Sequence, residues 1–262
     1  MRIGRVVLLL LCTAPGFAQS YLGFDKNGYP GDDLLPVLHR TFAYTGYWLN
    51  NPPGLSSNPW AGKRDVIRRA GFGFAVLFNG RLDRDLQGKD VAALGRFDAD
   101  LAVAAAKREG FSNHVVIFVD QEEGGRLLPE QLAYLGGWFA ELEKQGFRPG
   151  IYCSGIQVPD GKEVISTAGQ VHAQFPMARL WVANDQCPPA PGCVAHKLPP
   201  SQSGFSDALV WQFAQSPRSQ YAAGCGKQYA TDGKCYAPGL PASDKSFLDM
   251  NSSQSADPSG GR

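Results

Sequence analysis

The sequence predicts a single-domain α/β protein whose eight strands close into a barrel. Over the first two-thirds of the chain, short apolar runs typical of strands alternate with stretches of helical periodicity, which favours a parallel sheet. Three further strand-like runs follow without convincing helices, and eight strands are enough to close a barrel. We therefore expect a TIM-like (β/α)5β3 barrel. An open, doubly wound sheet is the alternative, although no Gly-rich phosphate loop supports a dinucleotide-binding sheet.

The expected elements follow from composition and periodicity. The strands share β-branched, aromatic and other apolar residues and lie at residues 21–25, 41–49, 73–78, 115–119, 150–153, 179–183, 209–213 and 246–250. The helices are expected at residues 32–40, 63–70, 90–109, 129–145 and 162–174. The run Val-Val-Ile-Phe-Val at 115–119 is typical of a strand buried on both faces. Pro129 in the first turn and Gly146 at the end delimit one helix well.

The two ends of the chain are expected to lie outside the barrel. Residues 1–18 combine a basic start, a short apolar run and small residues, which is typical of a cleavable signal peptide. That run is shorter than the roughly 20 residues that a membrane-spanning helix needs. An exported protein, secreted or periplasmic, with no integral membrane segment after signal removal is thus predicted. Residues 19–251 would form the domain, and residues 252–262, mostly Ser, Gly, Asp and Pro, would form a disordered tail.

Charge and cysteine usage narrow the class of protein. The chain has 25 Lys and Arg against 24 Asp and Glu, without a basic run, so nucleic acid is not an expected partner. A monomer is expected.

Two cysteine pairs enclose Pro- and Gly-rich loops, which agrees with export and predicts two local disulfides, Cys187 with Cys193 and Cys225 with Cys235. A zinc site is the alternative, but the spacings match no Cys-x2–4-Cys pattern. Cys153, inside an apolar strand, is expected to be a buried thiol.

Four acidic residues are expected at one end of the barrel. Asp25 ends the first strand, Asp120 and Glu122 end the fourth, and Asp249 ends the eighth. Residues past the carboxyl ends of barrel strands line the active face, so these acids are expected to converge. Asp120 and Glu122 are two apart and therefore point the same way, whereas Glu123 points away.

Such a cluster is suited to cleaving a glycosidic bond. Two acids facing one site repel when both are ionised, so one is held protonated near neutral pH. The chemistry needs one protonated carboxyl for the leaving oxygen and one carboxylate for the oxocarbenium-like centre. Glu122 is the expected acid, Asp120 the neighbour that raises its pKa and orients an acetamido group or a water. Asp25 and Asp249 would supply negative charge beneath the sugar. Alone, each acid could equally be a helix cap or turn residue.

Aromatic and polar side chains near strand ends are the candidates for binding a sugar. Aromatic rings stack on the apolar faces of sugars, while amides and guanidinium groups hydrogen-bond hydroxyls. Any one of these rings could instead belong to the core. The candidates are Tyr44, Tyr47, Trp48, Asn79, Arg81, Arg126, Tyr152, Trp181, Asn184, Trp211 and Gln212.

The strand-end residues as a set resemble the family 25 lysozyme-like glycoside hydrolases, which are (β/α)5β3 barrels that cleave peptidoglycan. The resemblance rests on six short motifs: Gly23-Phe24-Asp25, Asp120-x-Glu122, Pro149-Gly150-Ile151-Tyr152, Leu180-Trp181-Val182-Ala183, Trp211-Gln212 and Leu248-Asp249-Met250-Asn251. It implies that Glu122 is the acid and that Asp25, Asp120 and Asp249 support it. The sequence looks closer still to a bacterial glycoside-hydrolase-like group, domain of unknown function 1906.

These observations predict a glycosidase that cleaves an aminosugar polymer such as peptidoglycan, without cofactor or metal. The first alternative is a carbohydrate-binding barrel that has the cleft but no turnover. The second is metal-assisted phosphodiester hydrolysis at the acid cluster, although the four histidines have no partner at ligand spacing.

Overall fold

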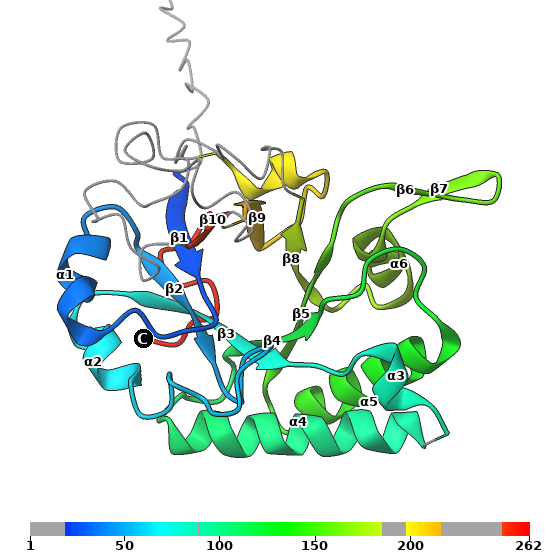
Figure 1. The fold of residues 1–262 in the computed structure, drawn as a ribbon, viewed down its shortest axis with the longest axis horizontal. Helices are drawn as coiled ribbons and strands as arrows, with labels where there is room; N and C mark the ends of the chain where they lie inside the picture. Colours follow the sequence, from blue (N-terminus) through cyan, green and yellow to red (C-terminus); the bar gives the residue numbers. More distant parts are fainter. Residues whose placement is uncertain (1–18, 89, 185–197, 216–247) are drawn as a thin grey trace, which may run out of the picture.

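Eight strands close into a barrel in the computed structural model, which describes residues 19–88, 90–184, 198–215 and 248–262 (Figure 1). The barrel strands are β1 (Tyr21–Asp25), β2 (Tyr44–Trp48), β3 (Gly73–Asn79), β4 (Val116–Gln121), β5 (Arg148–Ser154), β8 (Arg179–Ala183), β9 (Val210–Ala214) and β10 (Asp249–Ser253). Their order around the barrel is β1-β10-β9-β8-β5-β4-β3-β2. The predicted barrel is thus confirmed, and the open-sheet alternative is wrong.

The last strand runs against both of its neighbours. β10 pairs antiparallel with β1 and with β9, and its register places Asp249 opposite Asp25. The sequence predicted a strand at 246–250 that ends near Asp249, whereas the strand begins there. Because the direction is reversed, the amino end of β10 lies at the carboxyl ends of the other strands. Asp249 therefore lies at the expected end of the barrel, but as the first residue of its strand and not as one of the last.

The helices lie around part of the barrel, and apart from an unexpected 3-10 turn at Pro200–Ser203 their bounds match the expected ones closely except in two places. They are η1 (Asp32–Leu34), α1 (Leu35–Leu38), α2 (Arg64–Arg69), α3 (Asp83–Leu86), α4 (Val91–Arg108), α5 (Pro129–Lys144), α6 (Thr167–Gln174) and η2 (Pro200–Ser203). α4 and α5 lie side by side, in contact at Gly95 and Gly137 (Figure 1). An added Cβ at either glycine would lie 2.1 Å from a carbonyl oxygen of the other helix.

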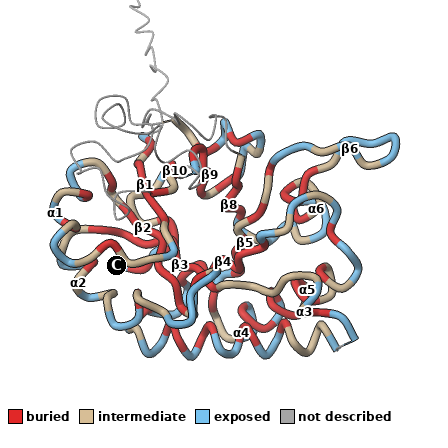
Figure 2. The backbone as a smooth tube through the Cα atoms, viewed as in Figure 1, coloured by how far each residue is buried: buried red, intermediate tan, exposed pale blue. Residues whose placement is uncertain are grey.

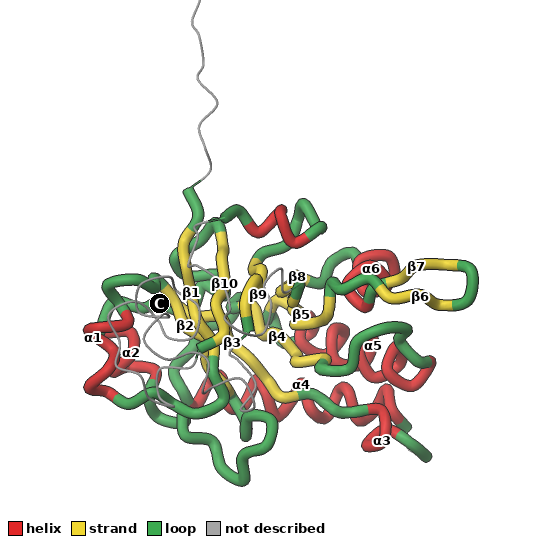
Figure 3. Tube along the Cα trace, turned by 45° about the horizontal axis from the view of Figure 1, so that its top comes forward, coloured by secondary structure: helices red, strands yellow, loops and turns green. Residues whose placement is uncertain are grey.

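The first difference is the short helix α3, which the sequence analysis did not expect. The second is a hairpin, β6 (Val158–Asp160) and β7 (Glu163–Ile165), where the start of a helix at 162–174 was predicted. The helix α6 begins only after Ser166, whose hydroxyl caps it by accepting from the backbone of Gly169 at 3.1 Å. Figure 3 shows the hairpin projecting away from the barrel, and Figure 2 shows that its tip is exposed.

Residues 254–262 form an ordered arm across the amino ends of β3 and β4, so the predicted disordered tail is wrong. Pairing between β3 and β4 begins only at Val76 and Ile117, which leaves backbone groups below it to be satisfied. The arm satisfies them: Asp257 Oδ1 accepts from Phe74 N, and Ser259 Oγ accepts from Val76 N, each at 2.8 Å. Ser259 is fully buried. A composition of small polar residues suggests disorder when it is considered by itself. Here these residues accept the hydrogen bonds that a neighbouring strand would otherwise accept from β3.

The remaining predictions concern the cysteines, the signal peptide and membrane-spanning segments. Cys153 is a buried free thiol, as predicted. The expected signal peptide at 1–18 and the four cysteines of the expected disulfides, Cys187, Cys193, Cys225 and Cys235, lie outside the described residues. Within the described ranges, no helix is both long enough and apolar enough to cross a membrane.

We expect Ser259→Ala to lower the free energy of unfolding by about 1–3 kcal/mol, because the buried N–H of Val76 would lose its acceptor. Urea unfolding followed by circular dichroism measures this change. Gln254→Ala, an exposed position on the same arm, is the control and should stay near wild type. Equal stability of both variants would mean that the arm does not support the barrel.

Candidate active site at the carboxyl ends of the strands

The structure brings all four predicted acids to one pocket of about 120 Å³ at the carboxyl ends of the barrel strands. We call it the acid pocket. Its lining comprises Asp25, Asn27, Trp48, Leu77, Asp120, Glu122, Tyr152, Trp181, Gln215 and Asp249. The acids come from β1, β4, the residues just after β4, and β10, so only the closed barrel gathers them.

The two acids of the fourth strand lie as their spacing predicts. Asp120 and Glu122 both line the acid pocket. Glu123 points away, where its Oε2 accepts from the backbone N–H of Asp83 at 2.8 Å and from Gln131 Nε2 at 2.7 Å. Glu123 therefore ties the start of α3 to α5 and takes no part in the pocket.

Asp25 is held by two side-chain amides. Its Oδ1 accepts from Asn251 Nδ2 at 2.7 Å and from Gln212 Nε2 at 3.0 Å. The indole of Trp181 donates to Asn251 Oδ1 at 2.8 Å. Because an indole N–H can only donate, Asn251 must turn its oxygen to Trp181 and its NH2 group to Asp25. Tyr152 donates its hydroxyl to Gln212 Oε1 at 2.8 Å, while the NH2 group of Gln212 faces Asp25.

Asp120 has no comparable support. Its Oδ1 is buried without a hydrogen-bond partner among the described residues. Burial raises the pKa of Asp120 well above its usual range, and the charges of Glu122 and Asp25 add to the shift. A buried carboxyl without donors is more stable as the neutral acid.

Asp25 and Glu122 also have raised pKa values. Burial raises the pKa of Asp25 well above its usual range, followed by the charge of Asp249, while the amides of Asn251 and Gln212 act in the opposite direction. Partial burial of the carboxyl group raises the pKa of Glu122, and the charge of Asp249 adds to it. The repulsion expected between Asp120 and Glu122 raises the pKa of Asp120 rather than being the main charge effect on Glu122. The cluster therefore retains protons to higher pH than isolated carboxyl groups would.

Of the predicted sugar-binding residues, three line the acid pocket and two lie beneath it. Trp48, Tyr152 and Trp181 are in the lining, Gln212 holds Asp25, and Tyr44 is buried inside the barrel. The Tyr44 hydroxyl has no hydrogen-bond partner in the described part of the chain.

Four other candidates do not reach the pocket. Tyr47 packs on Trp60, Phe74 and Phe111 outside the barrel and donates its hydroxyl to Glu109. The other three are engaged elsewhere: Trp211 donates to the carbonyl of Asn184, Asn184 to that of Ser203, and Arg126 forms an ion pair with Asp160. Tyr47 and Trp211 are misplaced because neighbouring strand residues point to opposite faces, whereas Asn184 and Arg126 lie in loops, where their partners hold them away from the pocket.

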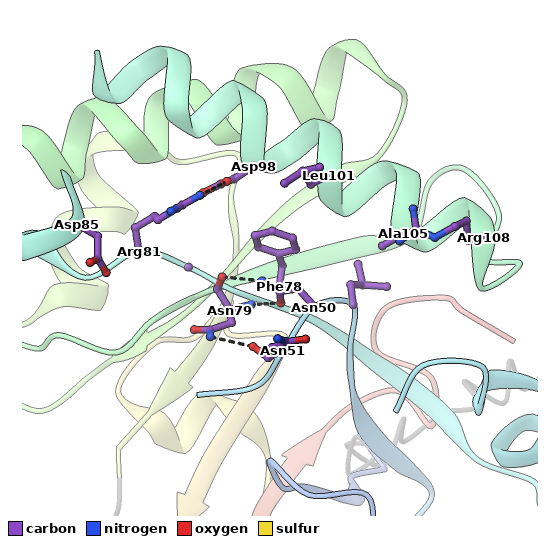
Figure 4. A pocket seen from close by; sticks show the side chains of 12 residues that line it. Asn50, Asn51, Phe78, Asn79, Arg81, Asp85, Asp98, Leu101, Ala105 and Arg108 are labelled. Atoms are coloured by element: carbon purple, nitrogen blue, oxygen red, sulfur yellow. Dashed lines mark hydrogen bonds and ion pairs between the residues drawn. The ribbon is translucent and has the colours of Figure 1, made fainter. Parts of the chain in front are cut away.

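Asn79 and Arg81 line a different cavity, on the outer side of β2 and β3 (Figure 4). Conversely, the sequence analysis missed Asn27, Leu77, Gln215 and Asn251. The last was detectable: it lies two residues after Asp249 and shares its face of the strand.

A barrel with a carboxylate-lined mouth defines a glycoside hydrolase-like class of protein. The chain belongs to the Rv2525c-like, glycoside hydrolase-like domain family, whose model matches residues 43–196. This confirms the resemblance to glycoside hydrolase-like proteins. No curated protein matches the chain.

Solved structures share the fold at low identity. An uncharacterized protein of B. stearothermophilus has a TM-score of 0.55 and 19% identity, covering 88% of this chain and 94% of its own. The Tat-secreted protein Rv2525c of Mycobacterium tuberculosis has a TM-score of 0.53 and 12% identity, covering 89% and 94%. The spore cortex lytic enzyme SleM of Clostridium perfringens has a TM-score of 0.52 and 15% identity, covering 90% and 68%.

We expect Asp120→Asn to raise the thermal unfolding midpoint at pH 7 by a few degrees. The folded-state pKa of Asp120 is raised, so the wild type loses stability as the pH rises from the unfolded-state value towards the folded one, and the amide variant escapes that loss. Calorimetry between pH 4 and 8 measures the difference, which should shrink at pH 4. Asp65→Asn, at an exposed position, is the control. A gain that does not depend on pH would contradict the assignment.

Proposed function

We propose that this protein is an exported glycoside hydrolase that cleaves an aminosugar polymer such as peptidoglycan, with Glu122 as the proton donor. One observation carries the proposal: of the acids in the pocket, Glu122 combines an exposed position with a raised pKa, whereas Asp25 and Asp120 are buried. An acid that is accessible to a bound substrate and that holds its proton to higher pH than a free glutamate is what the leaving oxygen requires.

The remaining acids divide the other tasks. In the proposed reaction Glu122 protonates the glycosidic oxygen, and the bond from that oxygen to the anomeric carbon breaks. The positive charge that develops on the sugar is stabilised by the negative charge of Asp249 and by Asp25, whose two amide donors favour its ionised form against the effect of burial. Attack on that carbon comes from water or from the substrate's own acetamido oxygen, which Asp120 orients. Glu122, left as a carboxylate, then accepts the proton of the incoming water.

The relatives support the substrate class and the export. SleM is described as a spore cortex lytic enzyme and Rv2525c as Tat-secreted, and both share this fold. The signal-like pattern at 1–18 agrees with export. Metal-assisted hydrolysis has less support, since no group of three or more His, Cys, Asp and Glu side chains in the described ranges could hold a metal ion.

Glu122→Gln should lower kcat for release of reducing ends from purified cell walls by about 100-fold or more, with little change in KM, because the amide cannot donate the proton. The matched control is Glu143→Gln, an exposed glutamate on α5. Circular dichroism would verify that both variants are folded. Wild-type activity in Glu122→Gln would refute the assignment of the acid. A wild-type protein that binds cell walls without releasing reducing ends would instead be a carbohydrate-binding barrel.

Asp249→Asn should move the alkaline limb of the kcat–pH profile to lower pH. The charge of Asp249 raises the pKa of Glu122, so its removal lets Glu122 lose the catalytic proton at lower pH. An alkaline limb that stays in place, or moves to higher pH, would show that Glu122 is not the group titrating there.

A further inference from the structure

A second cavity of about 580 Å³ lies behind the wall of the acid pocket, between the ends of β2 and β3 and the helix α4 (Figure 4). We call it the outer groove. The two cavities share no lining residue: Trp48 and Leu77 face the acid pocket, whereas their neighbours Leu49 and Phe78 face the outer groove. Alternation along a strand produces this arrangement, so one wall separates two sites.

One side of the outer groove is a single face of α4. Asp98, Leu101, Ala105 and Arg108 line it at intervals of three and four residues, which places them along one stripe of the helix. Ten residues separate the first from the last, so the stripe is about 15 Å long at about 1.5 Å per residue. The groove is therefore elongated.

The opposite side is a fixed row of asparagines. Asn50 Oδ1 accepts from Asn79 N at 2.7 Å, and Asn50 Nδ2 donates to Asn79 O at 3.0 Å. Asn79 Nδ2 donates to the carbonyl of Asn51 at 2.9 Å (Figure 4). The side-chain oxygen of Asn79 has no hydrogen bond with any described residue, which leaves an oriented acceptor at the groove.

The two ends differ in charge. At one end Arg81 is bound to the buried Asp98 through Nε at 2.7 Å and Nη2 at 2.8 Å, and Tyr134 donates to the same carboxylate at 2.9 Å. Arg81 is thus neutralised but keeps Nη1 as a donor. At the other end Arg108 is exposed and forms no ion pair or hydrogen bond with the described residues. It is a cation available to an anionic group.

The apolar part of the groove does not suit a sugar ring. The only aromatic side chain among its lining residues, Phe78, is 4% exposed and offers no stacking surface. Leu101, by contrast, is 45% exposed. An accessible aliphatic side chain, an amide acceptor and a terminal guanidinium group match a peptide better than a glycan.

We propose that the outer groove binds a short, extended peptide whose carboxylate pairs with Arg108. At about 3.3 Å per residue, about four or five residues span the 15 Å stripe. A backbone N–H of the peptide donates to Asn79, a carbonyl accepts from Arg81 Nη1, and a small side chain contacts Leu101. The assignment of this peptide to the substrate rests on the proposed function: peptidoglycan carries short peptides on its sugars, so the groove would select peptide-bearing strands.

Calorimetric titration tests the proposal with the peptidoglycan tetrapeptide alanyl-γ-glutamyl-lysyl-alanine, with its C-terminal amide and with tetra-N-acetylchitotetraose. The free acid should bind the wild type, and Arg108→Gln should weaken it about tenfold. Lys107→Gln, the neighbouring exposed cation outside the groove, should change binding less than twofold. The amide should bind the wild type as weakly as the acid binds Arg108→Gln, and amidation should have no further effect in that variant.

Three outcomes would overturn the proposal: no binding of the tetrapeptide at millimolar concentration, an equal effect of Arg108→Gln and Lys107→Gln, or competition by the sugar tetramer for the site that depends on Arg108. Peptide binding that persists in Glu122→Gln supports the groove independently of hydrolysis. The proposed function and the peptide site can thus fail separately.

Discussion

Four carboxyl groups share a pocket of about 120 Å³, and their mutual repulsion is the constraint on which the mouth of the barrel depends. Two of the four, Asp25 and Asp120, are buried, where an ionised carboxylate loses hydration that only donors can replace. The chain provides such donors for one of them. Asp25 receives two amide hydrogen bonds, while one oxygen of Asp120 receives none from the described residues. The missing donor at Asp120 lowers the stability of the folded state and favours a cluster that retains protons.

The antiparallel last strand makes this arrangement possible. A parallel strand would present the residues at its carboxyl end to the mouth, whereas β10 presents its first residues. Asp249 and Asn251, two apart on the same face, thereby reach the pocket and the carboxylate of Asp25. The chain after β10 then returns beneath the barrel, and the hydrogen bonds of Ser259 and Asp257 fix it to β3. The strand that supplies an acid and a donor is thus followed by a segment that is fixed to the barrel.

Local patterns were sufficient for the strands and for the gathering of the acids. Each strand is a short apolar run, and closure brings the ends of β1, β4 and β10 together whatever the direction of the last strand. Strand direction was not predictable, because a short apolar run has the same pattern whether the strand lies parallel or antiparallel to its neighbours. The ordered arm was missed because its partner, the unpaired backbone of β3, is invisible in the composition of residues 254–262.

The alternation of side chains along a strand can be read from the sequence, and it explains why two of the predicted binding residues, Tyr47 and Trp211, do not face the pocket. Tyr47 and Trp48 are adjacent, as are Trp211 and Gln212, so at most one of each pair can face the interior. In the first pair Trp48 lines the pocket, and in the second Gln212 holds Asp25. Both lie on the interior face of their strands.

The direction of the hydrogen bonds also assigns the two sides of the pocket different chemistry. Trp181 can only donate, so it sets the orientation of Asn251, and Asn251 in turn can offer Asp25 only a donor. Donors favour a carboxylate over the neutral acid, which makes the β1–β10 side the better place for negative charge. No such donor reaches Oδ1 of Asp120 in the described part of the chain, and Glu122 beyond it is open to the pocket. Burial raises the pKa of both Asp25 and Asp120, but amide donors oppose the shift only at Asp25, so a proton is better held on the β4 side of the pocket.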